Sequence, residues 1–258
     1  MLLASGLTAS FLIAGLSAYR LRRGDRGGDA TASLRAAVIA AAILIPVQIF
    51  IGDLHGLNTL EHQPAKIAAM EGLWTTERGA ALRLIAFPDE ETRTNRFELA
   101  VPKVASVILT HSLDGEIKGL DEFPDHPPVA PVFWAFRVMV GMGILMLSVS
   151  WLGAWQLRRG GTTRPWLQYA LVAMTFSGWI ATIAGWYVTE IGRQPWLVTG
   201  VLRTAEAASA VPAPVIGLSL SVYLTLYVVL LLSYVLVLFH MAGKAATGKA
   251  PAGLSREA

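Results

Sequence analysis

Five long apolar runs constrain the fold of this chain more than any other feature of its sequence. They cover residues 2–19, 36–52, 129–157, 166–189 and 211–239. Each run is long enough to supply the roughly 17–25 residues with which a helix crosses the hydrocarbon core of a bilayer. Because backbone polar groups must be satisfied internally in that core, each run is expected to be helical. The sequence therefore predicts an all-α integral membrane protein with five transmembrane helices.

The charged residues are sorted by loop, which predicts the orientation of the chain. Arginine and lysine dominate the short segments after the first, third and fifth runs, whereas residues 53–128 hold thirteen acids and seven bases. Basic residues gather in cytoplasmic loops of membrane proteins. We therefore expect the N-terminus and the long loop outside and the C-terminus inside. The net charge of +3 then needs no nucleic-acid partner.

The long loop at residues 53–128 is far longer than an ordinary connection, so we expect a functional extracytoplasmic subdomain. Residues 64–74 predict a short helix that starts at Pro64. Alternating residues 81–87 and 96–101 flank a turn-forming stretch and predict a β-hairpin. The expected organisation follows from these elements. It comprises two transmembrane helices (1–52), the loop (53–128), three transmembrane helices with cofactor-binding positions (129–241) and a disordered cytoplasmic tail (242–258).

The ionisable residues at the ends of the apolar runs are the first candidates for a site. Glu190 ends the fourth run, and a carboxylate there is costly unless something requires its charge. Trp186 lies four residues earlier, so both side chains share one helix face. An interface anchor would explain Trp186, Arg193 and Trp196, because such residues gather at headgroup level. It does not explain Glu190.

The third run contains Arg137, which is expected either to reach the membrane surface or to pair with an anionic group. The chain has no cysteine, which excludes disulfides and thiolate metal sites. None of its five histidines lies inside a run. Met139 and Glu190 are then the intramembrane groups able to bind iron. Methionines such as Met139 and Met142 are more often simple packing residues, so the ligand role needs further support.

Four motifs together resemble subunit I of the cytochrome bd-type quinol oxidases, in the cyanide-insensitive branch with a short quinol loop. They are the Phe-Trp-Ala-Phe-Arg-Val-Met segment at 133–139, residues 185–196 with Gly-Arg-Gln-Pro-Trp, the Gly-Asp-Leu-His-Gly turn at 52–56, and the Gln-Pro-Ala-Lys-Ile-Ala-Ala-Met-Glu segment at 63–71. The resemblance extends to about Phe239. It implies a bacterial inner-membrane enzyme that reduces dioxygen to water with electrons from quinol. Such an enzyme uses two haems b and one haem d and no copper. Its reaction is electrogenic, although it pumps no protons.

The resemblance also implies roles for the residues of the spans. Met139 matches the axial ligand of the low-spin haem b, and Arg137 matches the arginine that stabilises its reduced form. Glu190 matches the ligand of a high-spin haem b, with Trp186 beside it. Arg193 is expected to pair with haem propionates.

Lys66 and Glu71 match the quinol-site pair of the family. A carboxylate in a partly apolar groove can accept a proton from quinol while a cation orients the ring oxygen. Without the resemblance, a surface helix with scattered charges would be the better explanation of both residues.

The chain lacks the N-terminal half of that subunit, so it resembles the C-terminal half alone. A split or a truncated reading frame would both produce such a chain, and the expected partners are the missing half and oxidase subunit II. Two alternatives stay open. One is a cofactor-free remnant or an assembly partner of subunit II. The other is a transporter or receptor, which would need polar residues or broken helices at the bilayer midplane; apart from Pro46 the sequence shows little of this.

Overall fold

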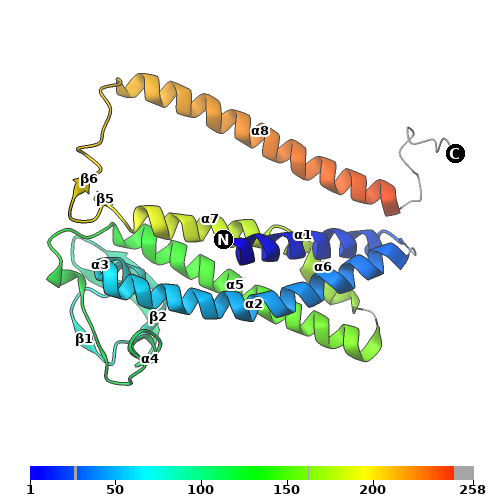
Figure 1. Ribbon diagram of the computed structural model, residues 1–258, viewed down its shortest axis with the longest axis horizontal. Helices are drawn as coiled ribbons and strands as arrows, with labels where there is room; N and C mark the ends of the chain where they lie inside the picture. The colour runs from blue at the N-terminus through cyan, green and yellow to red at the C-terminus, as the bar shows by residue number, and fades with distance from the viewer. Residues whose placement is uncertain (26–27, 162, 247–258) are drawn as a thin grey trace. The chain divides into compact units, whose positions relative to one another are not determined.

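The computed structural model describes residues 1–25, 28–161 and 163–246. Within these residues, five helical segments are long and apolar enough to cross a membrane (Figure 1). They are α1 (Leu2–Arg22), α2 (Gly28–His62), α5 (Val129–Gly160), the pair α6 (Pro165–Ala173) and α7 (Ser177–Ile191), and α8 (Ala213–Ala246). The predicted all-α membrane fold with five spans is confirmed.

The chain forms two compact units. The first, here the helical unit, comprises Met1–Leu44, Met146–Gly178 and the chain from Ser209 onward. The second, here the loop unit, comprises Ile45–Leu145 and Trp179–Ala208. All the candidate site residues named above belong to the loop unit.

Small residues bring α1 into direct contact with the fourth span inside the helical unit. A Cβ atom on Gly15 would lie 2.2 Å from Thr175 Oγ1 and 2.9 Å from the carbonyl oxygen of Leu171. A Cβ on Gly178 would lie 2.6 Å from the Cα of Thr8. Only glycine permits such an approach, as is common where helices pack in membranes.

The fourth span is interrupted, although the sequence predicts one continuous helix over 166–189. α6 ends at Ala173, and α7 begins at Ser177. At the break the Thr175 hydroxyl donates a 2.6 Å hydrogen bond to the carbonyl oxygen of Val172. A threonine can satisfy freed backbone groups in this way inside a membrane. Hydropathy is continuous across the break and therefore gives no sign of it.

Two helices are longer than expected. α2 continues to His62, so the predicted turn at 52–56 and the start of the predicted loop are helical. Glycine weakens a helix interior by about 1 kcal/mol relative to alanine but does not end it. α8 continues to Ala246, so residues 242–246 of the expected disordered tail are helical. The rest of that tail lies outside the described residues.

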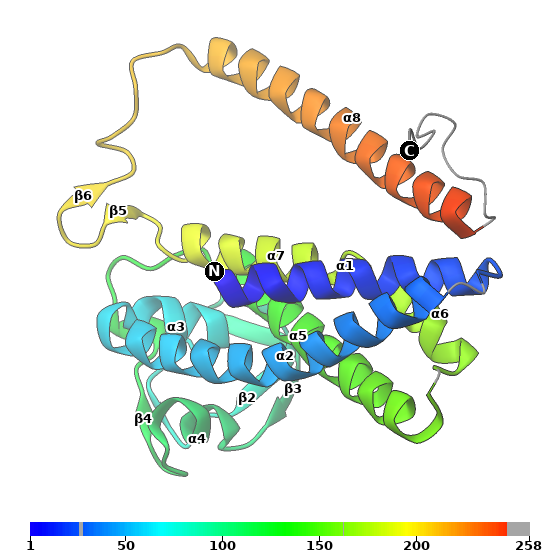
Figure 2. The same ribbon diagram turned by 45° about the vertical axis from the view of Figure 1, so that its right-hand side comes forward.

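The extramembrane part of the loop unit combines short helices and three small two-stranded sheets (Figure 2). The predicted hairpin is present as β2 (Leu82–Asp89) paired antiparallel with β3 (Thr94–Val101). The predicted short helix is α3 (Pro64–Glu71), closed by Gly72 in the left-handed conformation. The remaining elements are β1 (Glu77–Arg78) with β4 (Glu116–Ile117), α4 (Val104–Thr110), a 3-10 turn at Leu120–Glu122, and β5 (Trp196–Val198) with β6 (Leu202–Arg203).

One apolar core joins these short elements to the adjacent ends of α5 and α7. Ile67 and Leu73 are almost fully buried in a cluster with Val129 and Val132 of α5 and Val188 of α7. Burial of such side chains is worth about 1.5–3 kcal/mol each. α3 is therefore held directly over the beginning of α5 and the end of α7, the two helices that carry Met139 and Glu190.

Candidate functional site

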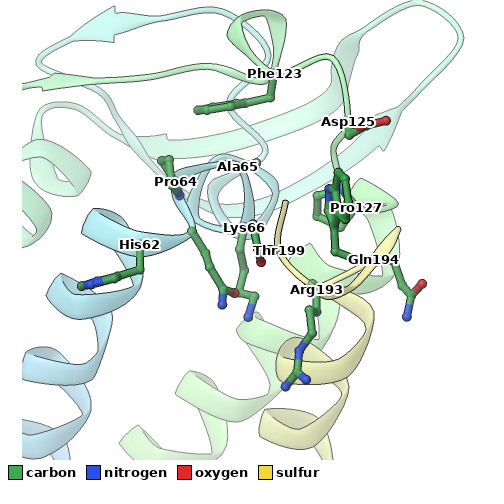
Figure 3. A pocket seen from close by; sticks show the side chains of 13 residues that line it. His62, Pro64, Ala65, Lys66, Phe123, Asp125, Pro127, Arg193, Gln194 and Thr199 are labelled. Atoms are coloured by element: carbon green, nitrogen blue, oxygen red, sulfur yellow. The ribbon is translucent and has the colours of Figure 1, made fainter. Parts of the chain in front are cut away.

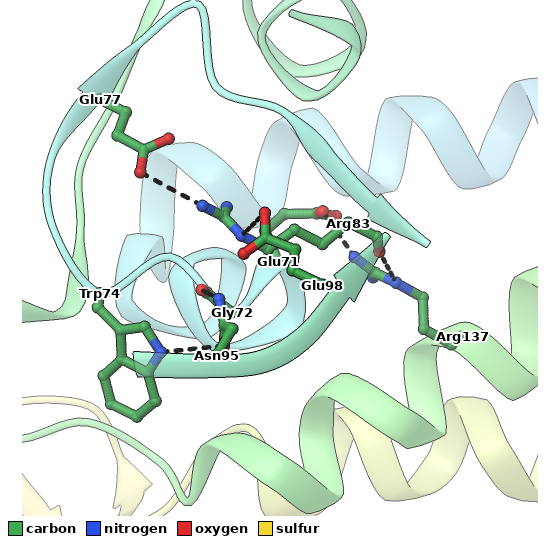
Figure 4. Close-up of polar contacts among 8 residues, drawn as sticks. All are labelled: Glu71, Gly72, Trp74, Glu77, Arg83, Asn95, Glu98 and Arg137. Atoms are coloured by element: carbon green, nitrogen blue, oxygen red, sulfur yellow. Dashed lines mark hydrogen bonds and ion pairs between the residues drawn. The ribbon is translucent and has the colours of Figure 1, made fainter. Parts of the chain in front are cut away.

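A buried ion pair connects α3 with α5. Arg137 Nη2 lies 2.9 Å from Glu71 Oε2, and the two side chains are only 10% and 7% exposed. The same guanidinium donates from Nη1 to the carbonyl oxygen of Met70 (2.9 Å) and from Nε to that of Arg83 (2.6 Å). It also lies 4.3 Å from the ring centroid of Phe133. Of the two expectations for Arg137, the structure shows the pairing with an anionic group (Figure 4).

Arg83 extends this ion pair into a larger network. It is nearly buried on β2, with Nη2 3.3 Å from Glu77 Oε1 and Nε 3.1 Å from Glu98 Oε1. Three carboxylates and two guanidinium groups thus meet between α3, the hairpin, β1 and α5. We call Glu71, Glu77, Arg83, Glu98 and Arg137 the buried charge cluster.

Burial controls the proton affinity of Glu71. Desolvation raises the pKa of Glu71 above its ordinary value of 4.5, and the positive charges of Arg137 and then Arg83 oppose this shift. A carboxylate whose pKa is moved towards neutrality is well suited to accept a proton. Glu71 therefore has the environment of a general base.

Lys66 lies on a different face of α3. Five residues separate it from Glu71, which corresponds to about 140° around a helix. Lys66 faces a cavity of about 150 Å³ that Gln63, Arg193 and Gln194 also line (Figure 3). Burial lowers the pKa of Lys66, and Arg193 acts in the same direction while Glu190 opposes it. The structure thus places the two residues of the expected quinol pair at separate points.

Met139 packs against one face of α7, and Glu190 projects from a different face of the same helix. A Cβ atom on Gly185 would lie 3.0 Å from Met139 Sδ, so the thioether rests in the space left by this glycine. Glu190 is five residues beyond Gly185, about 140° around the helix. Its carboxylate is 46% exposed, and its ion pair with Arg193 is long at 3.8 Å. Two ligands on different faces suit two separate iron atoms rather than one.

Trp186 is 58% exposed and packs its ring at 5.6 Å against that of Tyr187. It shares the face of Glu190 by helical spacing. Arg193 lies between the Lys66 cavity and Glu190, so it is the one residue of the chain's predicted set that contacts both places.

Sequence reasoning missed Arg83, Glu77 and Glu98. A signal for Arg83 was present, since it stands inside the apolar stretch Ala-Ala-Leu-Arg-Leu-Ile-Ala-Phe, where a charge is unexpected. Its position on the inner side of the hairpin made burial the natural consequence. Glu77 and Glu98 carried no comparable signal.

Several membrane helices that carry an extramembrane subdomain with buried ionisable groups define a class of protein that works at the membrane surface. Comparison with known proteins gives the family. Residues 1–246 match the family model described as cytochrome bd terminal oxidase subunit I, and the chain belongs to this family. The resemblance drawn from the four motifs is confirmed. The break between α6 and α7 would have suited a transporter, but the family match speaks against that alternative.

Individual relatives agree with this result. The chain is 29% identical to cytochrome bd-II ubiquinol oxidase subunit 1 of Escherichia coli, over 90% of the chain and 59% of the relative. It is 32% identical to cytochrome bd ubiquinol oxidase subunit 1 of Bacillus subtilis, over 78% of the chain and 46% of the relative. The structure of bd oxidase from Geobacillus thermodenitrificans matches with a TM-score of 0.84 and 31% identity, over 93% of the chain and 56% of that chain. The chain thus spans about half the length of these relatives.

Proposed function

We propose that this chain is part of a terminal oxidase that oxidises quinol at the outer membrane surface and passes the electrons towards dioxygen. The observation that carries the proposal is the burial of Glu71 in a subdomain held over α5 and α7, the helices of Met139 and Glu190. The family match supplies the reaction class. In this proposal the chain acts with oxidase subunit II and with the remaining part of subunit I, in a bacterial inner membrane.

Quinol oxidation releases two protons and two electrons. In this proposal one residue of the chain accepts a proton and others bind the quinol. Glu71 accepts a proton at a carboxylate oxygen, because its desolvated position favours the protonated form. Lys66 and Arg193 give the adjacent cavity a positive potential, which attracts the oxygen-bearing edge of the ring. Because α3 separates Lys66 from Glu71, binding and proton acceptance occur at separate points.

Two residues of the chain would each hold the iron of one haem. Met139 would hold the iron of a low-spin haem b through its thioether, and Gly185 leaves the space in which that sulfur lies. Glu190 would hold the iron of a high-spin haem b, since its carboxylate is 46% exposed and its ion pair with Arg193 is long at 3.8 Å. Trp186 would flank this group and Arg193 would pair with its propionates. Haem supplies one-electron redox chemistry when bound.

The finer features of the family enter as part of the proposal. The remaining part of subunit I would hold haem d and reduce dioxygen. Arg137, committed to Glu71 and to two carbonyl groups, would act on the low-spin haem through the position of α5. The reaction would be electrogenic because quinol protons leave outside while those for water enter from inside.

Reduced-minus-oxidised absorption spectra of membranes with the assembled oxidase test the haem assignments. We expect Met139→Leu to abolish the low-spin haem b band and Glu190→Gln to change the high-spin band, because each loses an axial ligand. Met142→Leu, on the same helix, is the matched control and should leave both bands unchanged. Wild-type bands that survive both ligand variants would contradict the assignment, and a featureless wild-type spectrum would favour the cofactor-free remnant.

A further inference from the structure

Arg83 is the buried charged residue that the proposed function does not use. We propose that Arg83 is a positioning residue that holds Glu98 and Glu77 beside Glu71, so that the hairpin provides the route by which the quinol proton reaches solvent. This inference rests on the proposed function, because it takes Glu71 as the first proton acceptor. It assigns a role to the hairpin β2–β3, which otherwise contributes only to the fold.

The charge balance of the cluster is the first argument. Its three carboxylates and two guanidinium groups carry a net charge of −1 when all are ionised. One added proton makes the cluster neutral. Glu71 is the buried acid of this cluster, and an uncompensated charge is costly at a buried position, so Glu71 is the member set up to take up that proton. Burial also raises the pKa of Glu71, while Arg137 and Arg83 oppose the shift.

The exposure of the three carboxylates is the second argument. The side chain of Glu71 is 7% exposed, whereas those of Glu98 and Glu77 are 33% and 37% exposed. Exposure therefore rises from the buried acid towards the two acids that Arg83 contacts. Arg83, whose positive charge acts on Glu71, thus connects the buried acid with two acids that exchange protons with bulk water.

The geometry of Arg83 is the third argument. A guanidinium does not give up its own proton in a protein, so Arg83 can organise a proton path without being a member of it. Its backbone carbonyl accepts from Arg137 Nε while its side chain contacts Glu77 and Glu98 (Figure 4). Its Nη1 and Nε are both buried without a hydrogen-bond partner among the described residues, so Nε meets Glu98 as an ion pair alone. Buried donors are nearly always satisfied, so a bridging water is expected there.

The proton steps balance as follows. The O–H bond of quinol in the Lys66 cavity breaks, its electron leaves to the haem acceptor of the proposed function, and its proton passes through water to a carboxylate oxygen of Glu71. The proton then passes through water to Glu98 or Glu77, which restores the Glu71 carboxylate. Release to bulk water restores the second carboxylate. No group in the cluster is consumed.

The pH dependence of quinol oxidation by the assembled oxidase tests the role of Arg83. Glu71 must be ionised to accept a proton, so its pKa sets the acid limb of the kcat profile. Arg83→Gln removes a positive neighbour and should move that limb to higher pH by about one unit. Glu98→Gln removes a negative neighbour and should move it to lower pH while reducing the plateau. Arg83→Lys keeps the charge and should restore most of the wild-type profile.

Arg78→Gln is the matched control, because Arg78 forms an exposed ion pair with Glu116 outside the cluster. The second readout is the infrared carboxyl band that Glu71→Gln removes, titrated in each variant without quinol turnover. If Arg83→Gln fails to assemble, the half-exposed Glu98→Gln carries the test. Profiles and band titrations that coincide with those of Arg78→Gln in both variants would overturn the inference. Full turnover in Glu71→Gln would instead refute the proposed function itself.

Discussion

Arg137 and Glu71 lie 66 positions apart in the chain, yet their side chains form its most deeply buried ion pair among the described residues. Removing two charges from water costs free energy, and the ion pair offsets this cost only when the other hydrogen-bond donors of the arginine also find acceptors. Two backbone carbonyl groups meet that need for Arg137. The pair therefore fixes the position of α3 on α5 as well as the protonation of Glu71.

The raised pKa of Glu71 makes stability depend on pH. Between the ordinary value of 4.5 and the higher native pKa, the folded chain keeps a proton that the unfolded chain has lost. Stability from this group is thus complete at low pH and is lost as pH rises through the native pKa. Glu71→Gln cannot titrate, so its thermal midpoint in detergent should fall less between about pH 5 and about pH 8 than that of the wild type.

Glu116→Gln, an exposed carboxylate on β4, is the control for that measurement and should keep the wild-type slope. Equal slopes for Glu71→Gln and wild type would show that burial does not govern this acid.

From the sequence alone, a candidate residue could be predicted only where its chemistry is out of place among its neighbours. Arg137 and Glu190 stand out because each is a charge at an apolar run. Their partners could not be predicted, because contact between α3 and α5 depends on packing across a long stretch of sequence. The same limit explains why Lys66 and Glu71, close in sequence, were expected at one point and lie at two.

At the scale of elements, composition was sufficient for the spans and the hairpin. Hydropathy locates a span because every turn of a helix that crosses the lipid core must be predominantly apolar. It does not register the break at Thr175, which depends on one side-chain hydrogen bond and on a neighbouring helix. Nor does it locate the end of α2, because helix propensity continues beyond the apolar residues.

The contact at Gly15 gives a prediction for the packing of α1. Gly15→Ala places a methyl group within 2.2 Å of the Thr175 hydroxyl and 2.9 Å of a backbone oxygen, so one helix must shift. Overpacking of this kind costs about 1–3 kcal/mol. We expect a lower thermal midpoint in detergent for this variant.

Gly52→Ala is the matched control, since its Cβ would meet nothing within 4 Å in a helical segment. It should be neutral or slightly stabilising. If Gly15→Ala were as stable as Gly52→Ala, the close packing of α1 on the fourth span would be wrong.

At the scale of the whole molecule, the orientation in the membrane follows from charge sorting and remains a proposal. The absence of cysteine from the chain allows a clean measurement. Thr92→Cys, at the exposed hairpin turn, should react with a membrane-impermeant maleimide added to intact cells. Gly160→Cys, at the end of α5, should react only after the membrane is opened. The reverse pattern would place the charge cluster on the cytoplasmic side.

α5 carries Arg137 and Met139 two residues apart, which is about 3 Å along the helix axis. Arg137 forms an ion pair with Glu71 of the extramembrane subdomain, and Met139 lies against α7. A helix is stiff over so short a distance, so a displacement of the backbone at Arg137 also displaces the backbone at Met139. The placement of Met139 against α7 therefore depends on the same rigid stretch of α5 that the Arg137–Glu71 ion pair holds to α3.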